Sequence, residues 1–177
     1  MRCRCPIPCK STQSKVGASL HEVVVGAALA GLMLAIAVSD WRRYRVPDPL
    51  VALALLLRVV DVLVAPPGPR GEVLGDALLR AATMAAFFSL FRLAYRRWRG
   101  REGMGLGDVK LAAVAGAWVD WPLLPFVIEF AALSGLALAF ARALGAGHGL
   151  RRDTKLPFAV GFAAAIFVGW QYQRLSL

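Results

Sequence analysis

The chain has 177 residues, of which 58% are hydrophobic and 18% are charged, and its mean hydropathy is +0.59. Ordinary soluble domains contain roughly 45–50% apolar and about 25% charged residues, so this composition excludes a disordered chain. The apolar residues also come in blocks too long for one-sided burial in a soluble domain. We therefore expect a membrane protein.

The net charge is +10, from 21 Lys+Arg and 11 Asp+Glu. In a soluble protein such a charge would suggest nucleic-acid binding. Here the basic residues cluster beside apolar blocks, as in Arg42-Arg43-Tyr44-Arg45 and in the segment Arg96-Arg97-Trp98-Arg99. That pattern is typical of membrane proteins, whose flanking Lys and Arg residues contact anionic lipid. We expect membrane lipids as partners, and no nucleic acid.

Six apolar blocks follow one another along the chain, at residues 23–41, 49–65, 73–95, 111–119, 123–144 and 156–172. A bilayer-spanning helix needs about 20 residues, so six spans would use about 120 residues and leave only short loops. The predicted fold class is all-α, a polytopic membrane protein with about six transmembrane helices. The fourth block is short for a span.

We divide the chain into a basic N-terminal tail, residues 1–21, and a six-helix membrane domain, residues 22–177. All three cysteines lie in the tail, at Cys3, Cys5 and Cys9. Their spacing is not that of a zinc ribbon, and an odd number leaves at least one without an intramolecular partner. We expect no metal and no cofactor.

The basic loops follow the first, third and fifth blocks, which places these three loops in the cytoplasm by the positive-inside rule. The tail opposes this assignment, because its own basic residues would then lie outside. Within the apolar blocks, Arg58 with Asp61 and Asp76 with Arg80 have the spacing of pairs on one helix face. Glu129 is expected to face the bundle interior, near Arg80 or Arg58.

Two aspartates stand at span boundaries on the predicted cytoplasmic side. Asp40 closes the first block and Asp108 opens the fourth, so both should lie at one membrane depth. Burying an unpaired carboxylate is costly, which makes such residues functional candidates. The alternatives are that Asp108 caps a helix N-terminus and that Asp40 pairs with Arg42 or Arg43.

The segments around these aspartates resemble the signatures of the type IV prepilin peptidases, the GxGD-type aspartic membrane proteases. Asp40 precedes a basic stretch that ends in Val46-Pro47-Asp48, where the family has Ile-Pro-Asn, and Asp108 lies in Gly105-Leu106-Gly107-Asp108-Val109-Lys110. The segment 154–161, TKLPFAVG, is similar to the opening of the family's last span. The resemblance covers most of the chain from about Glu22 onward.

The resemblance implies that Asp40 and Asp108 are the catalytic pair. Two carboxyls that share one proton can hydrolyse a peptide bond, because the ionised one activates water while the protonated one polarises the carbonyl. Gly105 and Gly107 would let the substrate backbone approach. Lys110 and Pro47 match the surrounding motifs, although Lys110 could equally extend to lipid phosphate. Which aspartate is the acid stays open.

The implied function is an aspartic endopeptidase that removes the leader peptide of a type IV prepilin or pseudopilin. The precursor helix is the expected partner, and the active site would lie at the cytoplasmic face of the bacterial inner membrane. The chain is similar to the compact members that serve Flp-type pili, without the cysteine-rich insert of the methyltransferase-bearing members. The alternatives are a small ion-coupled transporter or channel, and a non-catalytic assembly scaffold. The oligomeric state stays open.

Overall fold

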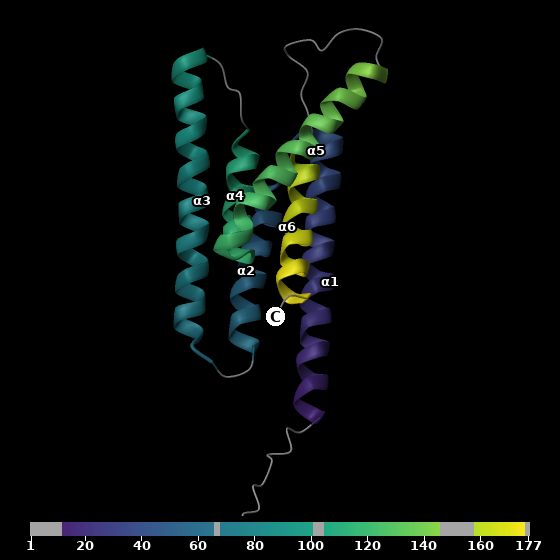
Figure 1. Cartoon of the computed structure of the whole chain (residues 1–177), viewed down its shortest axis with the longest axis vertical. Coiled ribbons are helices and arrows are strands. Elements are labelled where there is room, and N and C mark those ends of the chain that lie inside the picture. Colours follow the sequence, from purple (N-terminus) through teal and green to yellow (C-terminus); the bar gives the residue numbers. More distant parts are fainter. Residues whose placement is uncertain (1–11, 66–67, 101–104, 146–157, 176–177) are drawn as a thin grey trace, which may run out of the picture.

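The computed structural model describes residues 12–65, 68–100, 105–145 and 158–175, and in these residues all regular structure is helical. The all-α class is confirmed, and the described part of the chain contains six α-helices and one short 3₁₀-helix (Figure 1). The elements are α1 Thr12–Arg43, α2 Asp48–Val64, α3 Arg70–Arg99, α4 Leu106–Trp118, η1 Trp121–Leu123, α5 Leu124–Gly145 and α6 Phe158–Leu175.

Three segments are long and apolar enough to cross a membrane, namely Leu20–Arg43, Arg70–Arg99 and Trp121–Ala141. The helices differ in length more than the apolar blocks suggested, because α1 has 32 residues and α4 only 13. Thirteen residues rise about 20 Å, against about 30 Å for the hydrocarbon of a bilayer. The predicted shortness of the fourth helix is confirmed.

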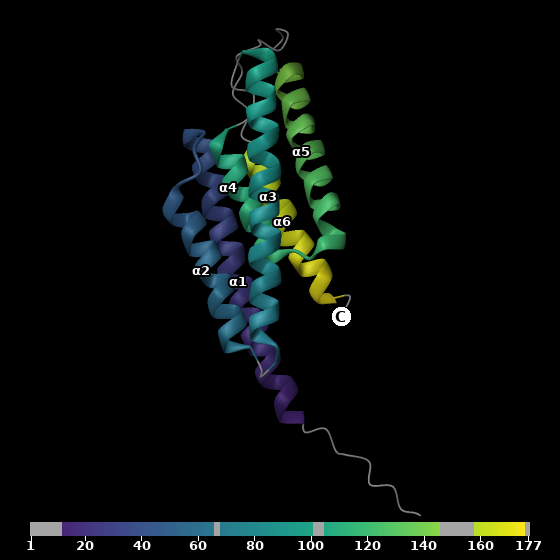
Figure 2. The ribbon, with the colours of Figure 1, turned by 90° about the vertical axis from the view of Figure 1, so that its left-hand side faces the viewer.

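The helices run up and down along one common direction, so that α1, α3 and α5 all finish at the same end of the bundle (Figures 1 and 2). We call this the basic end, because the last turns of α1 and α3 carry Arg42, Arg43, Arg96, Arg97 and Arg99. Helices α2, α4 and α6 begin there. The opposite end is called the far end below.

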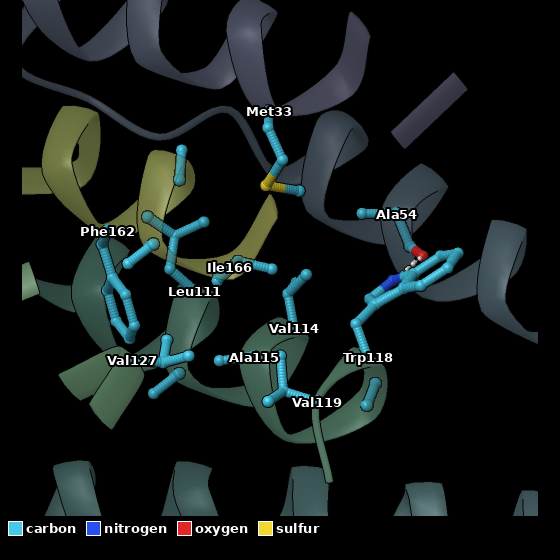
Figure 3. Close-up of a cluster of buried hydrophobic side chains, with 14 of the residues drawn as sticks. Met33, Ala54, Leu111, Val114, Ala115, Trp118, Val119, Val127, Phe162 and Ile166 are labelled. Atoms are coloured by element: carbon cyan, nitrogen blue, oxygen red, sulfur yellow. Dashed lines mark hydrogen bonds between the residues drawn. The ribbon is translucent and has the colours of Figure 1, made fainter. Parts of the chain in front are cut away.

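Helix α4 forms the centre of the core and is buried on nearly all sides. Seven of its residues are buried: Leu111, Ala112, Val114, Ala115, Gly116, Ala117 and Trp118. They pack against α2, α3 and α6, as in the cluster around Leu111, Val114 and Ile166 (Figure 3). The buried indole of Trp118 donates a hydrogen bond of 3.0 Å to the carbonyl oxygen of Ala54 on α2. An apolar helix without a polar face is expected in such a central position.

Gly116 allows α4 to contact the backbone of α3. A Cβ atom built on Gly116 would lie 2.5 Å from the carbonyl oxygen of Arg80. From the α3 side, Arg80 Nε donates a hydrogen bond of 3.1 Å to the carbonyl oxygen of Gly116. Small residues commonly permit this approach of helix backbones in membranes.

A cluster of charged side chains joins α1, α2 and α6 toward the far end. Arg58 contacts Asp61 at 2.5 Å, which confirms their predicted pairing on one helix face. On α6, Nη2 of Arg174 lies 3.7 Å from Oδ2 of Asp61, and Nη1 of Arg174 lies 3.0 Å from Oε1 of Glu22 on α1. His21 lies 3.6 Å from Asp61, which is itself only 2% exposed. We call these five residues the far-end ion cluster.

Two predictions about charged residues are wrong. Arg80 pairs with Asp120, at 3.3 Å, and not with Asp76, which is exposed on α3. Glu129 is exposed and does not face the bundle interior. The reason is that α5 packs through a row of positions that includes Val127 and Ala131, and Glu129 lies off this row.

Gly116→Ala should lower the melting temperature of the detergent-solubilised protein, because the added methyl group would overlap the α3 backbone. Gly75→Ala is the matched control: it lies on α3, and a Cβ atom there would have nothing within 4 Å. Alanine favours a helix over glycine by about 1 kcal/mol, so the control should keep or slightly raise the melting temperature. Equal melting temperatures for the two variants would contradict the tight contact of α4 with α3.

Candidate active site

Asp40 lies in the last turn of α1 and is only 7% exposed. Its Oδ2 accepts a hydrogen bond of 3.0 Å from the backbone N–H of Ala159. Ala159 is the second residue of α6, where backbone N–H groups have no partner within their own helix. The positive end of the α6 dipole also favours an anion there. The carboxyl of Asp40 therefore joins the end of α1 to the start of α6.

A sharp reversal follows Asp40 and brings the chain back into α2. The backbone N–H of Tyr44 donates a 2.8 Å hydrogen bond to the carbonyl oxygen of Asp40. Tyr44 has a left-handed backbone with φ of 50°, a conformation that is uncommon outside glycine. Pro47 then precedes the first residue of α2, Asp48, and fixes an extended entry into the helix. Pro47 thus has a structural role in the segment that follows Asp40.

Asp108 lies in the first turn of α4, outside the three candidate membrane spans. Its backbone N–H donates a 3.2 Å hydrogen bond to the carbonyl oxygen of Gly105. Burial raises the pKa of Asp108 to about 6; a hydrogen bond from the Gly105 backbone N–H lowers the pKa, and the charge of Asp40 raises it further. The two aspartates are thus close enough to interact electrostatically.

The geometry supports the capping interpretation of Asp108 in part. A carboxylate that reaches back to the backbone N–H at the helix start is the acidic half of a capping box. The same carboxyl is partly buried and interacts with the charge of Asp40, which an ordinary cap at a protein surface does not require. Capping and interaction with Asp40 are therefore both present.

The two motifs that contain Asp40 and Asp108 contact each other directly. A Cβ atom on Gly107 would lie 2.8 Å from Cγ2 of Val46, so only glycine fits against the turn after α1. Lys110 forms an ion pair with Asp48, the first residue of α2. A Cβ atom on Gly105, in contrast, would make only ordinary van der Waals contacts, the nearest at 3.7 Å from Oδ2 of Asp108. Gly107 and Lys110 hold the two segments together.

The structure adds two groups that the sequence analysis did not single out, the backbone N–H of Ala159 and the carboxylate of Asp48. A backbone donor leaves no signal in a sequence, because every residue except proline carries one. Asp48 was visible only as part of the Val46-Pro47-Asp48 ending.

The segment 154–157 and the three cysteines lie outside the described residues. Within the described residues, no group of three His, Cys, Asp or Glu side chains is placed to hold a metal ion.

Asp108→Asn should raise the melting temperature at pH 7.5, by roughly 2–4 °C if the gain is about 1 kcal/mol. A folded-state pKa of about 6, above the ordinary 3.8, means that the folded protein loses stability as the pH rises from about 4 through about 6. The asparagine has no charge to bury, and its Oδ1 can still accept the Gly105 N–H. The difference should vanish near pH 4, where Asp108 is protonated.

Asp76→Asn is the control for this measurement, because Asp76 is exposed. It should show no pH-dependent difference in melting temperature from the wild-type chain. An Asp108→Asn variant that is less stable than wild type at pH 7.5 would contradict the burial cost assigned to Asp108.

Comparison with known proteins finds leader peptidases both among family models and among individual relatives. Residues 27–140 match the model of the type IV leader peptidase family. Similar relatives include a prepilin leader peptidase/N-methyltransferase of Pectobacterium carotovorum, 34% identical over 140 residues, which cover 75% of this chain and 45% of the relative. The corresponding protein of Aeromonas hydrophila is 29% identical over 186 residues, covering 95% of this chain and 59% of the relative.

Leader peptidase HopD of Escherichia coli is 37% identical over 100 residues, which cover 56% of this chain and 64% of the relative. No solved structure matches the chain significantly. The chain spans about half the length of the first two relatives. The family match covers well over half of the chain, including both aspartate motifs. The chain is a bacterial membrane protein and belongs to the type IV leader peptidase family.

Proposed function

We propose that the chain is an aspartic endopeptidase that removes the leader peptide of a type IV prepilin or pseudopilin, with Asp40 and Asp108 as its catalytic pair. The observation that carries this proposal is the position of the two carboxyls. They come from separate motifs, both lie at the basic end, where Asp40 is buried and Asp108 is partly buried, and they interact electrostatically. The names of the relatives, a prepilin leader peptidase/N-methyltransferase and a leader peptidase, support a precursor leader as the substrate.

The chemistry needs one proton on the pair. Two neighbouring carboxyls do not ionise together readily, so the pair keeps one proton to a higher pH than a lone carboxyl does. The ionised carboxylate removes a proton from water, and the water oxygen adds to the scissile carbonyl carbon. The protonated carboxyl donates to the carbonyl oxygen. Collapse of the tetrahedral intermediate breaks the C–N bond: the departing amine takes a proton from the pair, and one hydroxyl of the intermediate returns its proton to the pair, which restores the starting state.

We place the active site at the cytoplasmic face of the inner membrane. The last turns of α1 and α3 carry five arginines at the end where Asp40 and Asp108 lie. Arginine and lysine flank membrane helices preferentially on the cytoplasmic side. Residues 44–47 alone separate α1 from α2, which leaves no room there for a cysteine-rich insert. This short turn supports a compact peptidase of the Flp type.

The transporter alternative has less support than it had from the sequence. It required Glu129 to face the bundle interior as an ion carrier, with Arg58 and Arg80 as counterions. Glu129 is exposed, Arg58 pairs with Asp61, and Arg80 pairs with Asp120. Variants at the two aspartates distinguish an assembly scaffold from a peptidase, because only the peptidase needs the two carboxyls for chemistry.

Asp40→Asn and Asp108→Asn should each abolish precursor cleavage, because either change removes the shared proton. The double variant should lose little more than either single one, since the pair acts as a unit. The measurement is the ratio of full-length to processed precursor in cells that contain equal amounts of each variant. Asp76→Asn is the matched control, because it removes an exposed carboxylate from a candidate span. Near wild-type processing by either active-site variant would refute the assignment.

The proposed orientation can be tested by cysteine labelling. The chain with Cys3, Cys5 and Cys9 replaced by Ser should still cleave precursor, because aspartic hydrolysis needs no thiol. In this background, cysteines at Arg43 or Arg99 should react with an impermeant maleimide only after the cells are permeabilised.

The position of Gly68, between α2 and α3 at the far end, serves as the external control. A cysteine there should react in intact cells. Labelling of Arg43→Cys or Arg99→Cys from outside would place the active site on the opposite face of the membrane.

A further inference from the structure

An apolar groove with a volume of about 350 Å³ lies between α3 and α5, with α6 as its floor. We call it the α3–α5 groove; its lining includes Phe87, Phe88, Phe91, Ile128, Ala132 and Phe158. Helix α3 packs mainly on α4, and α5 packs mainly on α6. The two helices diverge toward the basic end in Figure 1.

The groove has a rigid aromatic floor and exposed aromatic walls. Phe88 is 6% exposed and stacks on Phe162 of α6, with ring centroids 6.0 Å apart. Phe162 also contacts the ring of Phe158 edge-on at 6.0 Å. Phe87 and Phe91, on the wall formed by α3, are 57% and 53% exposed. The walls can therefore contact a bound molecule without any rearrangement of the buried floor.

The groove and the candidate active site share the first turn of α6. Phe158 begins α6, and the next residue, Ala159, donates its backbone N–H to Asp40. A segment bound beside Phe158 would therefore lie one residue along α6 from the backbone group that binds Asp40. The apolar cavity lined by Leu123, Phe126 and Tyr172 does not include the first turn of α6.

We infer that the α3–α5 groove binds the apolar helix of the precursor and sets the depth at which the scissile bond meets the two aspartates. This inference rests on the proposed function. About 350 Å³ accommodates a few side chains from one face of a helix. Helices that dock in grooves insert such anchors at i, i+3 or i+4 and i+7. The small, exposed side chain of Ala132 lets a helix backbone approach closely.

The groove wall offers no polar side chain, so it should select an apolar helix of suitable shape and not a particular sequence. The choice of the peptide bond that is cleaved would then depend on contacts at the basic end. A lipid acyl chain is the competing occupant, because both occupants are apolar. The connection to Asp40 favours the precursor helix, since a protease must align its substrate with its catalytic groups.

The molecule contains its own control surface. A second apolar groove of about 310 Å³ lies on another face of α5 and α6, lined by Leu123, Phe126, Val168 and Tyr172 among others. It is similar in size and largely apolar, but it includes residues at the start of α5 and the end of α6, toward the far end. The inference assigns no precursor contact to this second groove.

The first test fills each groove with a bulky side chain. Ala132→Trp should raise the KM for a purified precursor in lipid vesicles at least roughly tenfold, with kcat changed much less, because it blocks binding and not chemistry. Val168→Trp, in the second groove, should leave both constants near wild type. Both positions are exposed, so neither change should disturb the core, and equal melting temperatures would verify this.

The second test places a photoreactive phenylalanine analogue at Phe91 or at Phe126 in the Asp108→Asn chain, which should hold uncleaved precursor. Crosslinks to the precursor helix from position 91 but not from position 126 are expected. Unchanged KM in Ala132→Trp, or crosslinks from position 91 to lipid alone, would overturn the groove assignment. If the wild-type chain cleaves no precursor at all, the proposed function itself fails.

Discussion

The burial of the short helix α4 is the constraint on which the rest of the structure depends. Gly116 brings its backbone against that of α3, and Trp118 binds the backbone of α2. Because α4 is held on both sides and is too short to cross a bilayer, its first turn is fixed within the protein near the basic end. That first turn carries Asp108. The position of one candidate catalytic carboxyl is thus set by the packing of a helix whose other buried residues are apolar or small.

The partner carboxyl is positioned by a different means. Asp40 lies on α1 and is held by the first turn of α6, so two helices that are remote in sequence must meet for it to be buried with a donor. The Lys110–Asp48 ion pair and the Gly107–Val46 contact then bring the start of α4 against the turn after α1. Burying an acidic group near another acidic group opposes folding, as the raised pKa of Asp108 indicates. A function that needs a shared proton would explain why this cost is retained.

The sequence predicts the helices well because spans of apolar residues in a membrane leave the backbone little choice other than a helix. It also predicts that Asp40 and Asp108 lie at one end, since both stand at span boundaries. It predicts long-range partners poorly. The i, i+4 rule assigned Arg80 to Asp76 on its own helix, whereas Asp120 comes from beyond α4. The exposed side of α5 could not be identified either, because α5 is apolar on both its packed and its exposed faces. Glu129 was therefore placed on the wrong side.

The far-end ion cluster restricts sliding of the helices along their axes. Glu22, Asp61 and Arg174 come from α1, α2 and α6, and each charge has a partner on another helix. Apolar faces in a bilayer resist axial slippage weakly, because one leucine or alanine contact can replace another. A shift of a single helical turn is 5.4 Å, which would leave buried charges without partners. The cluster therefore fixes the vertical register of α1 against α6, and with it the alignment of Asp40 and Ala159 at the other end of the same two helices.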